Sequence, residues 1–345
     1  MSFLKNAWYV AAWSENLRIG EPEERTILGE TLVIYRSSLG VVTVLNNRCP
    51  HRFAPLHMGK VCANGNLRCG YHGLEFDSSG KCAKNPHGQT ASALRVRSYA
   101  SLERYGAVWV WMGDRPADEA AMPDLRVLEG APSQDVTYRD SVRMQAHYEL
   151  VMNNLMDLSH VPFLHGGLLG NDDTVAAEVK VLQENDTVTV TRYMQSVAPA
   201  PFFEMLFRGN GTLVDNWNSI TWIAPTCMIN DNGVTLPGTP KAQGTGVFGL
   251  HLLTPETDRS TMYYFVAVRQ NPLPFPEPVR QDIMAKLKSM RRFAFVTQDG
   301  PIIEGQQRSM DSAGPDVRPT LLESDRGTVL YKRILDKKIL AETSP

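Results

Sequence analysis

The sequence predicts two domains, an all-β domain at the N-terminus and an α+β domain at the C-terminus. The chain has 345 residues, which is long for a single domain. Residues 1–112 show short strand patterns separated by turn residues, whereas the later chain mixes strand and helix patterns. A segment rich in Pro, Asp and Ala, residues 113–123, lies between these two parts. We therefore expect domains at residues 1–115 and 116–345.

The strands of the first domain follow from alternating and apolar runs. Residues 31–35 and 41–45 are separated by a turn-forming Arg-Ser-Ser-Leu-Gly segment, which predicts a hairpin. Residues 73–77 form a short strand pattern, and residues 107–111 read Ala-Val-Trp-Val-Trp, which indicates a buried strand.

The second domain alternates between helix and strand patterns. Residues 147–158 predict a helix, and Pro162 should end or kink it, because proline lacks the amide donor. Four segments have strand patterns: residues 187–194, 219–224, 246–253 and 261–268. A second helix is expected at residues 278–294. Its apolar residues at helical spacing are Val279, Ile283, Leu287 and Met290.

Composition narrows the class of protein. Hydrophobic residues make up 43% and charged residues 21%, and the net charge is −2, so there is no electrostatic footprint for nucleic acid or an anionic membrane. Glu15 and Arg18 interrupt the apolar N-terminal stretch before it could form a signal sequence or span. Five cysteines, an odd number, argue against a disulfide scaffold. We expect a cytoplasmic protein with no membrane segment and no nucleic-acid partner.

Two short loops each present one Cys and one His. Cys49 and His51 flank a proline, and seventeen residues later Cys69 and His72 flank a Gly-Tyr pair. A zinc ribbon usually offers two Cys in each loop, so a structural zinc site is the less favoured alternative. A [2Fe–2S] cluster with two Cys on one iron and two His on the other needs this division. The pattern resembles a Rieske motif.

Nearby positions indicate which kind of Rieske cluster this is. Respiratory Rieske proteins commonly join the two loops by a disulfide, but the corresponding positions here are Ala54 and Tyr71. The motif therefore resembles the oxygenase and ferredoxin type, at the lower end of the Rieske potential range. Cys62 and Cys82 are expected to be reduced thiols packed as small hydrophobes, and no role is assigned to Cys227.

A second metal site is indicated further along the chain. His160 and His165 are five residues apart, and a break at Pro162 could turn both rings toward one point. Two imidazoles and one carboxylate form the facial triad of mononuclear non-haem Fe(II). On local sequence alone, a helix cap and a core histidine remain the alternative.

A family resemblance extends along nearly the whole chain. The matching segments are residues 6–10, the Cys-Pro-His-Arg run, and residues 71–75, 154–158 and 253–257. The chain resembles the oxygenase component of a Rieske non-haem iron oxygenase. The most similar group holds vanillate O-demethylase, dicamba monooxygenase and toluenesulfonate methyl-monooxygenase. This resemblance implies a Rieske [2Fe–2S] domain followed by a catalytic domain with a helix-grip-like antiparallel sheet and helices.

The resemblance also implies the iron ligands. By similarity they are His160, His165 and Asp299, with Asn154 beside the iron through a distant or water-mediated contact. Sequence spacing alone leaves other carboxylates open: Asp172, Asp173 and Glu304. Asp157 matches the family's bridging carboxylate, which joins the His160 side of one iron site to His72 of the partner subunit in a head-to-tail trimer.

The expected substrate site is less sharply defined. Asn230 and His251 match positions that contact the carboxylate of an aromatic acid, although a turn asparagine and a strand histidine remain the alternatives. Plausible apolar walls, which could equally be core, are Phe202, Phe203, Trp222 and Ile229. Residues 244–249 spell G-x-G-x-x-G but follow a loop and enter a strand, so no flavin or nicotinamide site is expected.

These features together predict the terminal oxygenase of a multicomponent Rieske system. A separate reductase, or a ferredoxin with its reductase, supplies electrons for O₂-dependent monooxygenation. The expected reaction is oxidative O-demethylation of an aromatic acid such as a methoxybenzoate, in a homotrimer. The alternatives are an aromatic methyl- or ring-hydroxylating Rieske oxygenase and, more remotely, an electron-transfer Rieske protein or a zinc-binding module.

Overall fold

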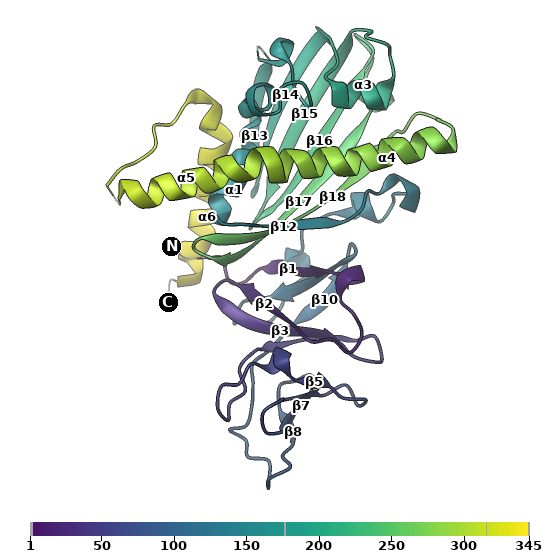
Figure 1. Ribbon diagram of the computed structural model, residues 1–345. Helices are drawn as coiled ribbons and strands as arrows, with labels where there is room; N and C mark the ends of the chain where they lie inside the picture. The colour runs from purple at the N-terminus through teal and green to yellow at the C-terminus, as the bar shows by residue number, and fades with distance from the viewer. Residues whose placement is uncertain (1–2, 176, 315, 344–345) are drawn as a thin grey trace. The chain divides into compact units, whose positions relative to one another are not determined.

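A computed structural model describes residues 3–175, 177–314 and 316–343. The chain forms two compact units, coloured from purple to yellow along the sequence in Figure 1. The first comprises the chain up to Met122 together with Thr254–Asp258, and the second comprises Pro123–Leu253 and the chain after Asp258. No helix among the described residues is long and apolar enough to cross a membrane.

The first unit is built from small antiparallel sheets (Figure 1). One has the order β1 (Trp8–Trp13), β11 (Ala107–Trp111), β10 (Ser101–Arg104). Another has the order β2 (Glu23–Ile27), β3 (Glu30–Arg36), β4 (Val42–Asn46), β9 (Ser98–Tyr99). A third has the order β5 (Lys60–Val61), β6 (Leu67–Arg68), β7 (Glu75–Phe76), β8 (Cys82–Lys84). The predicted hairpin is confirmed as β3–β4, and the predicted buried strand is β11, all of whose residues are buried.

The second unit contains a seven-stranded sheet of order β12-β18-β17-β16-β15-β14-β13. The bounds are β12 (Asp140–Met144), β13 (Glu178–Glu184), β14 (Thr187–Val197), β15 (Val214–Ile223), β16 (Cys227–Thr235), β17 (Thr245–Thr257) and β18 (Ser260–Gln270). Buried and less buried side chains alternate along β14, because successive side chains of a strand point to opposite faces. The predicted α+β class is confirmed, with all four expected strands present.

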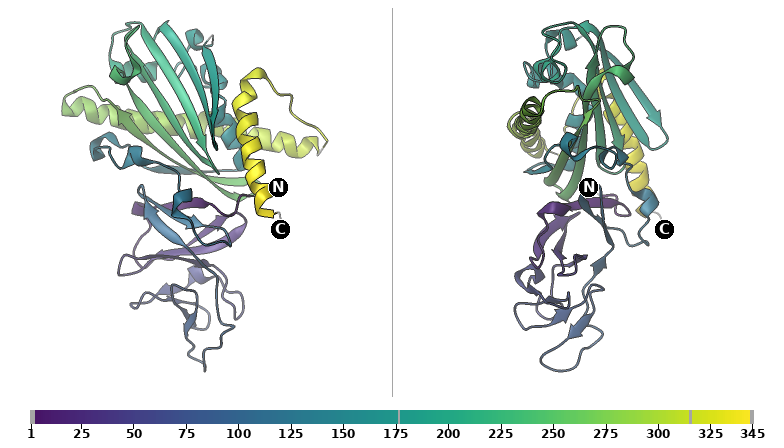
Figure 2. Two further views of the ribbon diagram at one scale, coloured as in Figure 1. Left: turned by 180° about the vertical axis from the view of Figure 1, so that it is seen from behind. Right: turned by 90° about the vertical axis from the view of Figure 1, so that its right-hand side faces the viewer.

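One long helical rod lies across the sheet face in Figure 1. It consists of α4 (Glu277–Arg292), a π-helical segment η9 (Phe293–Asp299) and α5 (Gly300–Ala313). Ile283, Leu287 and Arg291 are the buried residues of α4, each four positions from the next, so they form one stripe against the sheet. The helix expected at residues 278–294 is confirmed as α4, and α5 continues directly from Asp299. The last helix, α6 (Arg326–Thr343), follows. In Figure 2, α6 lies beside the edge of the sheet.

The shorter helices position the chain around His160. The predicted helix is confirmed as α1 (Tyr148–Met156), but Pro162 does not end it. The chain leaves helical geometry at Asp157, and Pro162 lies in the first turn of α2 (Val161–Leu164), where the missing amide costs no hydrogen bond. A further helix, α3 (Pro201–Phe207), was not expected from the sequence.

Candidate metal centres and substrate pocket

Two loops of the first unit repeat the same backbone hydrogen bonds. The N–H of Cys49 donates to the carbonyl of Ala54 at 3.0 Å, and the N–H of Cys69 donates to the carbonyl of Leu74 at 2.8 Å. Each cysteine carbonyl in turn accepts from the amide four residues later, at 2.8 Å and 3.1 Å. The two loops are therefore local copies of one turn, each presenting one thiol and one imidazole.

The four expected cluster ligands are divided between interior and surface. Cys49 and Cys69 are buried, whereas His51 is exposed and His72 is half-buried, with their ring centroids 4.5 Å apart. Burial, with a smaller contribution from Cys69, raises the pKa of Cys49 to about 11. A thiolate at this position therefore needs the positive charge of iron. Two inner thiols and two outer imidazoles fit a Rieske cluster.

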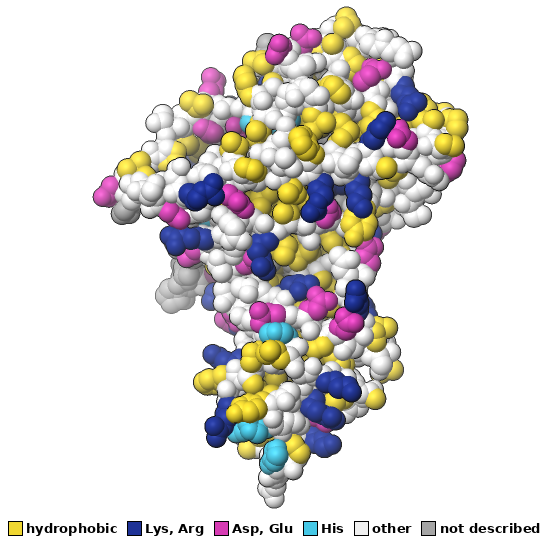
Figure 3. Space-filling model, in the orientation of Figure 1, with side chains coloured by type: hydrophobic (Ala, Val, Ile, Leu, Met, Phe, Trp, Pro, Cys, Tyr) yellow, Lys and Arg dark blue, Asp and Glu magenta, His cyan; other side chains and the backbone are white. Residues whose placement is uncertain are grey.

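Other histidine and cysteine side chains lie in the first unit or elsewhere in the chain, and their positions differ. Figure 3 shows histidine side chains at the surface of this unit, among hydrophobic and basic ones. His87, which the sequence did not single out, makes a 3.0 Å hydrogen bond between Nε2 and the carbonyl oxygen of His72. Cys82 is buried in the apolar cluster around the cysteine ligands, as expected, whereas Cys62 is partly exposed. Cys227 is a buried free thiol in β16.

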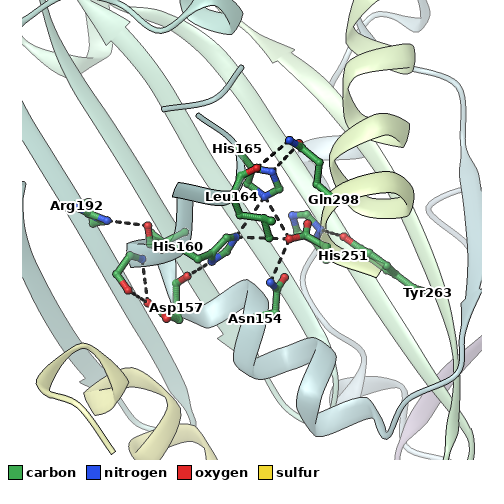
Figure 4. Close-up of polar contacts among 12 residues, drawn as sticks. Asn154, Asp157, His160, Leu164, His165, Arg192, His251, Tyr263 and Gln298 are labelled. Atoms are coloured by element: carbon green, nitrogen blue, oxygen red, sulfur yellow. Dashed lines mark hydrogen bonds and ion pairs between the residues drawn. The ribbon is translucent and has the colours of Figure 1, made fainter. Parts of the chain in front are cut away.

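In the second unit His160, His165 and Asp299 meet. The Nε2 atoms of the two histidines are 3.3 Å apart, and Asp299 Oδ1 lies 3.7 Å from His160 Nε2 and 3.2 Å from His165 Nε2. One ligand atom from each residue lies within 4.8 Å of the others. The two rings point toward one another in Figure 4. These residues come from the ends of η6 (Leu158–His160), α2 and η9, and two imidazoles with one carboxylate fit a facial triad for Fe(II).

The pKa values of the two histidines are shifted in opposite directions. Burial lowers the pKa of His160, although the carboxylate of Asp299 opposes this shift. Burial also acts to lower the pKa of His165, but its hydrogen bond to Asp299, the charge of that residue and a bond to Gln298 outweigh it and raise the pKa. Asp299 therefore favours the charged form of both imidazoles, and a cation between these residues would meet a carboxylate and two ring nitrogens.

The carboxylates left open by sequence spacing lie elsewhere. Asp172 and Asp173 form η7 (Asp172–Thr174), and Glu304 accepts a 2.9 Å hydrogen bond from the amide of Gln145. Among the described residues that could hold a metal ion, the histidine pair is grouped with Asp299.

A second layer of polar groups holds the triad in place (Figure 4). Asn154 Nδ2 donates to Asp299 Oδ1 at 3.1 Å, so Asn154 holds the carboxylate expected to bind iron. Its expected distant or water-mediated contact with the iron itself stays a prediction. His165 Nδ1 and Gln298 Oε1 are 2.9 Å apart, and Gln298 Nε2 donates to the carbonyl of Leu164 at 2.8 Å. Gln298 was not anticipated, because it lies 133 residues from His165 in the chain.

Asp157 contacts His160 differently from the expectation. Its main-chain carbonyl, and not its carboxylate, lies 2.5 Å from His160 Nδ1. The carboxylate oxygen Oδ1 accepts bonds from the amide and hydroxyl of Ser159, at 2.9 Å and 2.5 Å. Arg192 donates to the neighbouring Leu158 carbonyl at 2.7 Å. Residue 157 therefore orients the imidazole of His160 through its backbone, while Ser159 fixes the side chain of Asp157.

A cavity of about 110 Å³ adjoins the triad. Its apolar lining includes Phe202 and Phe203, as expected, whereas Trp222 and Ile229 do not line it. Trp222 packs near Tyr331 of α6, with ring centroids 5.4 Å apart.

The polar lining of the cavity comes from β15–β17. Asn230 pairs with Gly249 across β16 and β17, and His251 lies two residues further along β17, so all three face the cavity. Asn218 and Asn232 complete a short row of amides on the same sheet face.

Comparison with known proteins places this geometry in a family. Residues 7–100 match the Rieske [2Fe-2S] domain, and residues 144–341 match the vanillate O-demethylase oxygenase C-terminal domain. The chain belongs to the Rieske oxygenase components. It is 37% identical to the dicamba O-demethylase oxygenase component of Stenotrophomonas maltophilia over 98% of both chains. It is 34% identical to the vanillate O-demethylase oxygenase subunit of Pseudomonas sp. strain HR199, covering 99% of this chain and 96% of the relative.

A solved structure agrees with these matches. The crystal structure of dicamba monooxygenase bound to 3,6-dichlorosalicylic acid superposes with a TM-score of 0.93 at 35% identity, over the whole of both chains. The expected oxygenase class, Rieske cluster, mononuclear iron and separate electron-donating component are thereby confirmed for this Rieske oxygenase.

The two expected substrate contacts of this oxygenase are both engaged with neighbours. His251 Nδ1 lies 2.5 Å from the hydroxyl of Tyr263, and burial, aided by the charge of Arg291, lowers the pKa of His251 to about 3. Asn230 Nδ2 donates to Asn218 Oδ1 at 2.7 Å, and Asn230 Oδ1 accepts from Asn232. His251 is therefore neutral, and the amide of Asn230 is already paired.

The G-x-G-x-x-G run has a packing role. A Cβ at Gly244 would lie 2.6 Å from the Trp217 ring, and one at Gly249 would lie 3.2 Å from His251 Nε2. Gly246 approaches the backbone of Asn232 on the neighbouring strand. These glycines let β16 and β17 pack closely, and Gly249 keeps the cavity open beside His251.

Proposed function

We propose that this oxygenase carries out O₂-dependent oxidative O-demethylation of an aromatic acid such as a methoxybenzoate. The observation that carries the proposal is the mostly apolar cavity that adjoins His160, His165 and Asp299 and has a few polar groups at its sheet-side wall. Such a site suits a planar apolar ring with one polar substituent. The two O-demethylase relatives named above support the same reaction. We assign the cluster to residues 1–115 and the chemistry to residues 116–345.

The reaction requires two electrons from outside the chain for each molecule of O₂. One oxygen atom of O₂ enters a C–H bond of the methoxy group, the other leaves as water, and two electrons and two protons are consumed. The resulting hemiacetal collapses to a phenol and formaldehyde. His160, His165 and Asp299 would hold the iron, which would supply the site for O₂ activation. Phe202 and Phe203 exclude water from the reacting methyl group.

Electrons reach the chain from a separate reductase, or from a ferredoxin and its reductase. We propose a homotrimer in which the carboxylate of Asp157 accepts a hydrogen bond from His72 of the partner subunit. The half-buried Asp157 supports this role, because Ser159 occupies only one of its carboxylate oxygens. The carbonyl of the same residue contacts His160, so one residue would orient both imidazoles.

The test is substrate-dependent formaldehyde release under air. Purified protein with a surrogate reductase is given the methoxybenzoate isomers, and formaldehyde and the matching phenol should appear in equal amounts from at least one isomer. The ethoxy analogue of that isomer should yield acetaldehyde in place of formaldehyde, as a matched control. A reducible cluster and full iron content without either aldehyde, but with a benzyl alcohol from the methylbenzoates, would replace demethylation by methyl hydroxylation.

A further inference from the structure

Arg291 is a buried cation whose guanidinium is only partly hydrogen-bonded. Its side chain lies on the stripe of α4 that faces the sheet, and the residue is 9% exposed. Nη1 donates to Thr137 Oγ1 at 2.7 Å, and the guanidinium lies 5.1 Å from the centre of the Phe265 ring. Among the described residues, the buried Nη2 has no hydrogen-bond partner. Unpaired buried donors are rare and costly, so this one requires an explanation.

Nearby carboxylates do not supply the missing partner. Asp140 is ion-paired with Arg292 at 2.8 Å, and Asp299 is directed at the triad histidines, 3.2 Å from His165. Burial lowers the pKa of Arg291 to about 10, so the guanidinium stays charged at neutral pH. The charge of Asp140 still acts on Arg291, but this carboxylate is paired with Arg292 and leaves Nη2 of Arg291 without a hydrogen bond.

Two other buried arginines serve as a comparison. Arg192 donates to backbone carbonyls through Nη1 and Nη2, at 2.7 Å and 2.6 Å for the shortest bonds. Arg269 also has unpaired nitrogens, but it does not line the cavity. Arg291 differs from both because it lines the same cavity as the iron triad. Arg291 therefore forms part of the wall of this cavity and also carries an unpaired donor.

We propose that Arg291 binds the anionic group of the substrate, through a charge-assisted hydrogen bond from Nη2. This inference rests on the proposed function and specifies what the substrate must carry. Charge-assisted bonds of a guanidinium to a carboxylate are about twice as strong as neutral ones. The neutral His251 and the amides of the cavity wall carry no charge, so Arg291 sets the requirement for an acid.

The test is equilibrium binding in the absence of reductant, so that no turnover is needed. Calorimetry compares the tightest-binding methoxybenzoate with its carboxamide, which has nearly the same shape but no charge. Wild-type holoenzyme should bind the acid about 10- to 100-fold more tightly. Arg291→Met should reduce that ratio to about threefold or less while keeping the affinity for the carboxamide, and Arg291→Lys should retain an intermediate ratio. A parallel series with the sulfonate and its sulfonamide separates the two kinds of acid.

Arg292→Met is the matched control, because it removes one positive charge from the next residue, outside the cavity. It should leave the acid-to-amide ratio unchanged. Two results would overturn the proposal: a wild-type protein that does not prefer the acid, and an Arg291→Met protein that keeps the wild-type ratio. Arg291-dependent acid binding without formaldehyde would refute demethylation only. Formaldehyde from acid and amide alike would refute the role of Arg291 only.

Discussion

His165 and Gln298 form a hydrogen-bonded pair beside the proposed iron triad. Gln298 Oε1 lies 2.9 Å from His165 Nδ1, and Gln298 Nε2 donates to the carbonyl of Leu164, the residue next to His165. One amide thus holds the ring of His165 and the backbone of the preceding residue. Because Nδ1 is engaged, Nε2 is the atom that faces Asp299, which is what metal binding requires.

Replacing this amide should weaken iron binding. We expect Gln298→Leu to lower the affinity for Fe(II) about 10- to 100-fold, because the imidazole loses the acceptor that fixes its tautomer. Gln298→Glu keeps the acceptor and should lose less. The measurement is iron content during titration with a chelator, with the Rieske absorbance as an internal reference. Gln281→Leu, an exposed glutamine of α4, is the control, and equal iron loss in both variants would contradict the role of Gln298.

Removing one residue of the triad should release the mononuclear iron and leave the [2Fe–2S] cluster in place. We expect His160→Ala to lose about a third of the total iron, the mononuclear ion, while the visible spectrum of the [2Fe–2S] cluster stays unchanged. Iron analysis alongside the spectrum tests this. Iron at the wild-type level in that variant would exclude His160 as a ligand.

Asp157→Asn tests the charge of the bridge and not the orientation of His160. The bond to His160 comes from the main chain, so both metals should remain bound, whereas turnover should nearly cease because the carboxylate charge is lost. The measurement is the rate of cluster reoxidation when O₂ and substrate are added to reduced protein. Ser159→Ala keeps the charge but loses a bond to the carboxylate, worth about 1 kcal/mol, and should slow reoxidation only a few-fold. Wild-type rates in Asp157→Asn would refute the bridge.

Features formed by residues close together in the chain were predicted best from the sequence. Cys49 with His51, and Cys69 with His72, each lie within one turn, so their spacing alone carries the chemistry. Asn154 and Asp299 lie 145 residues apart, and only the packing of the helical rod onto α1 brings them together. Family resemblance named Asp299, which periodicity could not do.

Arg291 occupies a core-facing position of α4 that the apolar periodicity of the sequence did not mark, because the residue is charged. Ile283 and Leu287 predicted the buried stripe of α4, and Arg291 is the next position at a spacing of four. A charge at a core-facing position marks either a structural ion pair or a ligand site, and the sequence cannot decide between them. The π-helical segment after α4 is also not encoded in a recognisable pattern, although it sets the direction of Asp299.

His251 should make the catalytic unit sensitive to acid. Burial depresses its folded-state pKa to about 3, below the ordinary value of 6.5, so between these values the unfolded chain binds more protons. Stability is therefore lost as the pH falls through this window, by about 2 kcal/mol at pH 5. We expect wild type to lose about that much more free energy of unfolding than His251→Gln between pH 7 and pH 5, measured by denaturant titration. Tyr263→Phe keeps the buried imidazole and should retain the acid sensitivity, whereas an unchanged pH dependence in His251→Gln would assign that sensitivity to other groups.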